Sequence, residues 1–362
     1  MAKVMVTAGT HAGTRRLDRV RLHRLIPPAL LVGCLALSAV TLGVLGDAHI
    51  AAAVVVGLVA YAVVLVALSA LVEGRRRAVD RLVTTLVYGA FGLALVPLVS
   101  LLATVVVNGL ERFDLYFLTY TMRGVFGGMD AGGAYHAIVG TLLITGFAAV
   151  ISVPIGLLAA IYLVEYGTGR LSRAIRFFVD VMTGIPSIVA GLFAYAAFAT
   201  VFGPGIRLGV IGSVALSVLM TPVVIRSCEE MLTLVPNDLR EASYALGVPK
   251  WLTILKVVLP TATAGIATGV MLAIARVIGE AAPLLLVTGV VSSANYNLFD
   301  GRMMSLPVFV FRSYSQGLAP SGITTVNYER AWAAALTLIL IVMALNLVGR
   351  LIPRLFVPGG RR

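Results

Sequence analysis

Residues 236–260 read PNDLREASYALGVPKWLTILKVVLP, and this stretch predicts two helices joined by a sharp bend. Asp238 and Glu241 are spaced as a pair that starts a helix. Gly247 can take the left-handed conformation that ends a helix, and Pro249 suits the first turn of the next one. The apolar residues expected on one face of the first helix are Leu239, Ala242, Ala245 and Leu246. We therefore predict a short amphipathic helix, a bend and a second helix that runs on through Pro260.

The chain around this stretch is too apolar for a soluble protein. It is 59% hydrophobic and 12% charged, with a mean hydropathy of +1.00, whereas soluble domains are about 45–50% apolar and about 25% charged. In lipid the backbone must satisfy its own hydrogen bonds, so spanning segments of this kind are helices of about 20 residues. The apolar stretches of that length lie near Pro27–Leu45, Ile50–Val72, Thr84–Val107, Ala137–Leu163, Phe177–Val201, Leu208–Val224, Thr263–Val290 and Ala331–Leu351. We predict an all-α membrane protein with about eight transmembrane helices.

The basic residues are distributed as expected for a membrane protein with both termini in the cytoplasm. Of the 28 Lys and Arg residues, 21 fall on the side of the termini, six on the other side, and Arg276 inside a predicted helix. The clusters are short and separated by apolar stretches. A net charge of +12 therefore does not indicate a nucleic-acid partner, which requires one continuous basic face. We expect a multi-pass protein of the cell (inner) membrane in contact with the lipid bilayer.

Several kinds of site are missing from the sequence. No lysine follows a glycine, so there is no GxxxxGK[ST] phosphate loop, and the chain is not expected to bind ATP by that route. Cys34 and Cys228 have no metal-ligand or CxxC spacing. No histidine cluster or nucleophile motif favours a membrane enzyme. We expect neither a bound cofactor nor a metal, and a non-catalytic chain.

Two features point to function without deciding between alternatives. The helix before Gly247 fits either an interfacial amphipathic helix or a helix presented to a partner's groove. Arg276 is expected near mid-membrane, where a charge costs about 2.5–3.5 kcal/mol. Glu280, one turn further, is placed to pair with it. Together they are either a structural ion pair or a site where Arg276 meets an anion in transit, with Glu280 holding Arg276 or exchanging with the anion.

A proline in the fifth predicted helix has two possible interpretations. Pro186 breaks the helical hydrogen-bond ladder beside Ser187. Such a break is tolerated in a membrane where it lines a cavity or is covered by neighbouring helices. Either these residues contribute to a substrate pathway, or Pro186 makes a harmless kink.

The stretch 236–260 resembles the loop of ABC importer permeases, which has the form EAA, three residues, G, nine residues, IxLP. The matching positions are Glu241, Ala242, Ser243, Gly247, Val257, Leu259 and Pro260. Ser243 replaces the second alanine and Val257 the isoleucine. In that family the loop docks into the ATPase subunit and transmits its closure to the membrane helices. The resemblance implies this role for Glu241, Ala242 and Gly247, in a loop that Leu259 and Pro260 complete.

More of the chain is similar to the PstA-type permeases of phosphate importers. The segments that carry this resemblance are residues 137–166, ending AAIYLVEY; Gly184–Gly191, GIPSIVAG; Arg276–Pro283, RVIGEAAP; and Met304–Val308, MSLPV. The resemblance covers residues ~84 to ~356 and implies a six-helix type I ABC importer permease core. We accordingly predict that residues 83–356 form the permease domain, with the coupling loop 236–260. Residues 1–82 would then be a basic cytoplasmic segment and an extra transmembrane hairpin.

The resemblance implies a permease that translocates inorganic phosphate, with Arg276, Glu280, Pro186 and Ser187 along the substrate pathway. It also implies a cytoplasmic ATPase dimer that uses ATP and Mg²⁺, a second homologous permease of the PstC type, and an external phosphate-binding protein. Sulfate or molybdate would suit an arginine equally well, so a permease for another oxyanion is the first alternative. An ion-coupled secondary transporter is the second, although neither paired intramembrane carboxylates nor repeated halves are evident.

Overall fold

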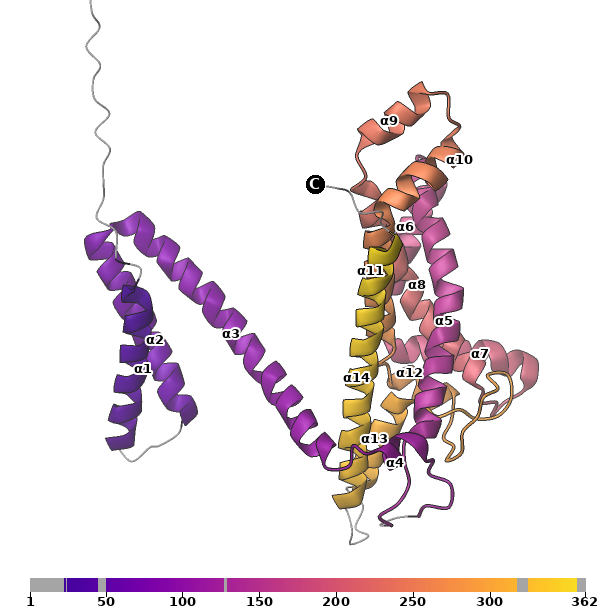
Figure 1. Ribbon diagram of the computed structural model, residues 1–362, viewed down its shortest axis with the longest axis horizontal. Coiled ribbons are helices and arrows are strands. Elements are labelled where there is room, and N and C mark those ends of the chain that lie inside the picture. Colours follow the sequence, from indigo (N-terminus) through magenta and orange to yellow (C-terminus); the bar gives the residue numbers. More distant parts are fainter. Residues whose placement is uncertain (1–22, 24, 45–49, 127–128, 318–324, 357–362) are drawn as a thin grey trace, which may run out of the picture. The chain divides into compact units, whose positions relative to one another are not determined.

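A computed structural model describes residues 23, 25–44, 50–126, 129–317 and 325–356 (Figure 1). These residues form helices and loops without a β-strand. The elements are α1 (Ile26–Val44), α2 (Ile50–Val72), α3 (Arg75–Leu110), α4 (Leu115–Thr119), α5 (Tyr135–Ile161), the π-helical turn η1 (Tyr162–Tyr166), α6 (Arg170–Thr183), α7 (Ser187–Phe202), α8 (Gly209–Thr233), α9 (Asn237–Ala245), α10 (Lys250–Thr253), the π-helical turn η2 (Ile254–Val258), α11 (Leu259–Val277), α12 (Ala282–Val287), α13 (Leu306–Gly317) and α14 (Thr325–Phe356).

The predicted all-α membrane fold is confirmed. Within the described part of the chain, seven helices are long and apolar enough to cross a membrane, and there are eight spans if the bent pair α6 and α7 counts as one. The chain divides into two compact units, Met1–Leu101 and Leu102–Arg362, so the division falls inside α3. The predicted functional boundary at residue 82 stays a prediction. The basic segment before Ile26 lies almost wholly outside the described residues.

In the first unit, α1 and α2 pack closely at a glycine. A Cβ atom added at Gly57 would lie 2.7 Å from the Ser38 hydroxyl oxygen, so only glycine allows this approach. The Ser38 hydroxyl in turn donates a 2.7 Å hydrogen bond to the Ala53 carbonyl oxygen. Where α2 ends, the buried Glu73 carboxylate accepts hydrogen bonds from Arg81 and Ser69. This hairpin is therefore held together by its own contacts.

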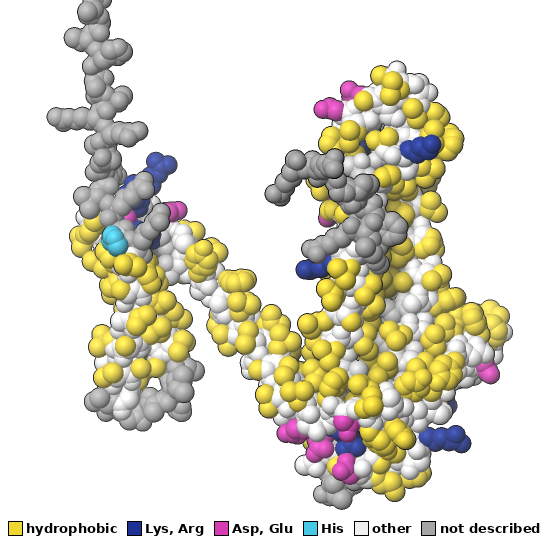
Figure 2. Space-filling view, in the orientation of Figure 1, with side chains coloured by type: hydrophobic (Ala, Val, Ile, Leu, Met, Phe, Trp, Pro, Cys, Tyr) yellow, Lys and Arg dark blue, Asp and Glu magenta, His cyan; other side chains and the backbone are white. Residues whose placement is uncertain are grey.

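In the second unit, α5 and α8 form the centre of the core. A Cβ atom at Gly156 would lie 2.6 Å from a methyl carbon of Val224, so these helices are in tight contact. At the other end of α5, Gly140 lies directly against the Met304 carbonyl, and Thr141 accepts a 2.7 Å hydrogen bond from the Leu306 amide. Figure 2 shows hydrophobic side chains along the length of this unit, with charged side chains gathered toward its ends. That distribution suits a lipid environment.

Two predicted helices are wrong as single segments. The stretch 177–201 is divided into α6 and α7, which meet at an angle of 108°. Gly184 ends α6, and Pro186, which has no N–H and disfavours helix in the residue before it, precedes α7. The stretch 263–290 is also interrupted, because α11 ends at Val277 and α12 begins at Ala282. Both breaks lie within long apolar stretches of the sequence, which is why each stretch was predicted as one helix.

Candidate functional site

Three of the four predicted pathway residues line one cavity in the second unit. The cavity has a volume of about 170 Å³ and lies where the break between α6 and α7 meets α8 and the end of α11. Its lining residues are Met182, Thr183, Ile185, Ser187, Leu219, Pro222, Val223, Arg276, Val277 and Glu280. Pro186 is not among them; it caps α7 and sets the position of Ser187. A larger depression on α1, of about 330 Å³, is lined by apolar residues and Cys34 and has no charged group.

The predicted ion pair between Arg276 and Glu280 is not formed. No N···O distance of 4.0 Å or less joins these residues, whereas six other ion pairs are present in the described residues. The reason is the end of α11 at Val277, which removes the one-turn relationship assumed for a continuous helix. The Glu280 amide instead donates a 3.0 Å hydrogen bond to the Val277 carbonyl oxygen. Arg276 therefore faces the cavity without forming an ion pair, and Glu280 lines the same cavity.

The two segments that interrupt predicted helices, Gly184–Gly191 and Arg276–Pro283, meet beside this cavity. A Cβ atom added at Gly191 of α7 would lie 2.8 Å from the Pro283 Cα atom of α12. Backbone cannot yield as a flexible side chain does, so Gly191 is required for this contact. The contact fixes α7 against the segment that follows Glu280.

Replacement of Gly191 by valine is expected to destabilise the protein by about 1–3 kcal/mol, because it overpacks the contact between α7 and α12. Thermal unfolding of the detergent-solubilised protein measures the effect. Gly146→Val is the matched control, since a Cβ atom at Gly146 of α5 meets nothing within 4 Å. Equal unfolding temperatures for the two variants would contradict the packing role of Gly191.

The loop 236–260 has the predicted helix, bend and second helix. α9 precedes Gly247, whose φ of +75° is the predicted left-handed conformation. The Val248 amide closes the bend with a 3.2 Å hydrogen bond to the Ser243 carbonyl oxygen. The second helical run begins after Pro249 and continues through η2 into α11, which Leu259 and Pro260 begin. The predicted capping pair is wrong: Pro236 precedes α9, no side chain caps it, and Asp238 lies in its first turn.

The apolar face of α9 has no cover within this chain. Glu241 and all four residues predicted for the apolar stripe are exposed, and the exposed fraction of Leu246 is 83%. Trp251 of α10 is 58% exposed beside it. Only Ser243 of α9 is buried, and its hydroxyl forms a 2.8 Å hydrogen bond with the Thr253 hydroxyl. Figure 1 shows α9 and α10 together at one end of the unit, opposite α4.

Sequence reasoning missed the residue that anchors this loop. The Glu165 side chain of η1 is 4% exposed, and its carboxylate accepts a 2.9 Å hydrogen bond from Arg240 of α9. Lys250 donates to the Glu165 carbonyl oxygen, and its ammonium lies 4.7 Å from the centre of the Tyr166 ring. The segment AAIYLVEY was noticed only as a resemblance. A signal was present in the carboxylate near the end of a long apolar stretch.

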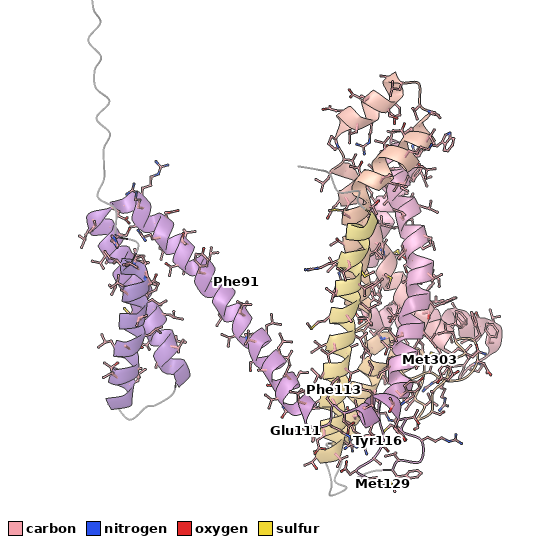
Figure 3. The ribbon with its side chains drawn as sticks, in the orientation of Figure 1. Phe91, Glu111, Phe113, Tyr116, Met129 and Met303 are labelled. Atoms are coloured by element: carbon pink, nitrogen blue, oxygen red, sulfur yellow. The ribbon has the colours of Figure 1, made fainter. Side chains whose placement is uncertain are left out.

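The opposite end of the unit is closed by loops and short helices. Figure 3 shows Glu111, Phe113, Tyr116 and Met129 gathered there. Arg112 and Asp130 form an ion pair at 2.5 Å within this group. At the same end the Tyr296 hydroxyl donates a 3.2 Å hydrogen bond to the Tyr135 hydroxyl, which raises the pKa of Tyr296 above its ordinary value.

Known proteins resemble the chain over most of its length. The family described as "Binding-protein-dependent transport system inner membrane component" matches residues 152–362. The phosphate transport system permease protein PstA 1 of Mycobacterium tuberculosis (strain CDC 1551 / Oshkosh) is 47% identical over 281 residues, which is 77% of this chain and 90% of that protein. The PstA protein of Pasteurella multocida is 38% identical over 76% of this chain and 95% of its own length.

Among solved structures, a chain of a bacterial alginate ABC transporter, in complex with an alginate pentasaccharide-bound periplasmic protein, has a similar fold. Its TM-score is 0.53 at 14% identity, and the match covers 78% of this chain and 97% of that one.

Proposed function

The chain belongs to the family of binding-protein-dependent transport system inner membrane components, and on this premise we propose that it is the permease subunit of an ATP-driven importer of inorganic phosphate. The observation that supports an anionic substrate is the cavity lined by Arg276, whose guanidinium forms no ion pair in the described structure. The names of the relatives, phosphate transport system permease proteins, favour phosphate over other oxyanions.

The size and chemistry of the cavity support an oxyanion. At about 30 Å³ for each water molecule, a volume of about 170 Å³ corresponds to between five and six waters, which is enough for a small oxyanion. The guanidinium of Arg276 has several donors in a planar fork that matches the oxygens of phosphate. The Ser187 hydroxyl lines the same cavity and can donate a further hydrogen bond. Glu280 repels the anion at short range, so it favours release over tight binding.

The energy for transport comes from a separate subunit in this proposal. The exposed apolar face of α9 docks into a groove of a cytoplasmic ATPase dimer that binds ATP and Mg²⁺. The charge distribution of the sequence supports a cytoplasmic position for α9 and for both termini. A second, homologous permease completes the pathway, and an external phosphate-binding protein delivers the substrate at the α4 end. Closure of the ATPase dimer then drives alternating access of the permease pair.

The whole importer, with its ATPase, second permease and binding protein, tests the substrate. Reconstituted in vesicles, it is expected to accumulate labelled phosphate only when ATP is supplied on the α9 side. A tenfold excess of unlabelled phosphate is expected to suppress the labelled uptake, and the same excess of sulfate or molybdate to leave it unchanged. Absence of labelled phosphate uptake, together with ATP-dependent uptake of labelled sulfate or molybdate, would assign the importer to that oxyanion. ATP-independent uptake would contradict the ABC mechanism.

A further inference from the structure

We infer that the Arg240–Glu165 ion pair is a mechanical link that carries movement of α9 to α5, in addition to the chain connections that carry it to α8 and α11. The inference rests on the proposed function, in which a partner ATPase moves α9. Arg240 and Glu165 are positioning residues in this scheme and touch no substrate. The pair joins residues 75 positions apart in the sequence, so it connects elements that no loop connects directly.

Arg240 binds three separate parts of the unit with one guanidinium group. Its Nε and Nη2 atoms donate to the same Glu165 carboxylate oxygen, over 3.1 Å and 2.9 Å. Its Nη1 donates to the Val235 carbonyl oxygen at 2.6 Å and its Nη2 to the Leu232 carbonyl oxygen at 3.0 Å. Leu232 belongs to the last turn of α8 and Glu165 to the turn η1 at the end of α5. One side chain of α9 thus holds the ends of two long helices.

The Arg240–Glu165 ion pair is expected to remain formed when α9 moves. The Arg240 and Glu165 side chains are only 12% and 4% exposed. Separating such a pair leaves a buried charge without a partner, which is strongly unfavourable. Lys250 adds a second attachment, because its ammonium group donates to the Glu165 carbonyl oxygen and lies over the Tyr166 ring. These contacts lie at a π-helical turn, a type of irregularity that is frequent at functional sites.

The chain and the ion pair connect α9 to different helices around the cavity. The chain runs from α9 through α10 and η2 into α11, which carries Arg276. The ion pair leads to α5, whose Gly156 packs against Val224 of α8. α8 supplies Leu219, Pro222 and Val223 to the cavity wall. A displacement of α9 reaches α11 along the chain and also α8, through residues 234–236, whereas it reaches α5 through the ion pair. Loss of the pair therefore removes this link to α5, which packs against the α8 wall of the cavity.

The test is the number of anions transported for each ATP hydrolysed by the whole reconstituted importer. Glu165→Gln is expected to lower this ratio at least about tenfold, with ATP hydrolysis and subunit assembly within about twofold of wild type. Glu165→Asp, which keeps the charge, is expected to retain more of the ratio than Glu165→Gln. The control is Arg226→Gln, because Arg226 of α8 forms an ion pair with Asp180 of α6 but is 53% exposed and has no hydrogen bond to η1 or α9 in the described structure. An unchanged ratio in Glu165→Gln would overturn the inference.

A double-mutant cycle covers the case in which Glu165→Gln also lowers assembly. Arg240→Gln and Glu165→Gln are expected to reduce the ratio by similar factors for each assembled importer, and the double variant by no more than either one. Multiplied losses would show independent roles and overturn the link. The ratio is measured with whichever anion the wild-type importer transports. Absence of phosphate uptake by the wild type would contradict the proposed function alone.

Discussion

The variant Arg276→Gln is expected to reduce phosphate uptake by the whole importer at least about thirtyfold. A hydrogen bond to a charged group contributes about 1.5–3 kcal/mol, and about 1.4 kcal/mol is a factor of ten. Glutamine keeps a hydrogen-bonding side chain of similar reach but removes the positive charge and the planar fork. Uptake of labelled phosphate into vesicles at fixed ATP gives the measurement.

Assembly is expected to survive this substitution, because Arg276 forms neither a hydrogen bond nor an ion pair in the described structure that its loss would break. Arg173→Gln is the matched control: it also removes an exposed arginine, from α6, but Arg173 is not in the cavity lining. Arg276→Lys is expected to fall between wild type and Arg276→Gln, since it keeps the charge without the fork. Wild-type uptake by Arg276→Gln would remove Arg276 from the pathway.

Local features of this chain could be predicted because they depend on neighbouring residues. The turn at Gly247 follows from the ease with which glycine adopts a positive φ, and the structure has that conformation. The apolar stretches near α2, α3 and α14 predicted helices because lipid-exposed backbone has no other solution. The exposed stripe of α9 followed from helical periodicity, although periodicity did not say what covers it.

Features that depend on the fold were predicted poorly. The predicted apolar stretches run across Gly184–Pro186 and across Ile278–Ala281. They therefore predicted unbroken helices where the chain turns. Pro186 predicts a break in the helix but not the angle of 108° at which α6 and α7 meet, nor the packing of α7 against α12 at Gly191. The predicted Arg276–Glu280 ion pair was wrong because it assumed an unbroken helix, whereas α11 ends at Val277.

Which residues line the cavity depends on contacts between segments that are far apart in the sequence. Ser187, Pro222 and Arg276 lie on different helices and meet only in the folded unit. Arg276 and Ser187 were selected in advance because intramembrane charges and helix breaks are unusual on physical grounds. Glu165 has a weaker local signature, a carboxylate near the end of an apolar stretch, and its importance comes from Arg240, which is far away in the sequence. Local chemistry thus identified candidate residues, and the fold decided which of them meet.

The bend after α9 is the second place where one substitution is expected to have a large effect. Gly247→Val places a β-branched side chain at a φ of +75°, which costs about 1–2 kcal/mol and favours a different backbone conformation. The new conformation redirects α9 and its exposed Leu246 away from the ATPase groove. We expect affinity for the ATPase subunit to fall at least about tenfold, because burial of a leucine contributes about 1.5–3 kcal/mol. Binding of the purified ATPase to the detergent-solubilised permease measures this.

The control for this prediction separates strain from docking. Gly203, at the end of α7, has a φ of +92°, and a Cβ atom there, as at Gly247, meets nothing within 4 Å. Gly203→Val therefore also introduces backbone strain, at a position outside the α9 loop, and is expected to bind the ATPase as wild type does. Leu246→Asp, which leaves the turn intact and places a charge in the apolar interface, is expected to reproduce the loss. If both Gly247→Val and Leu246→Asp bind the ATPase normally, α9 is not its docking helix, and its exposed apolar face lies instead at the membrane surface.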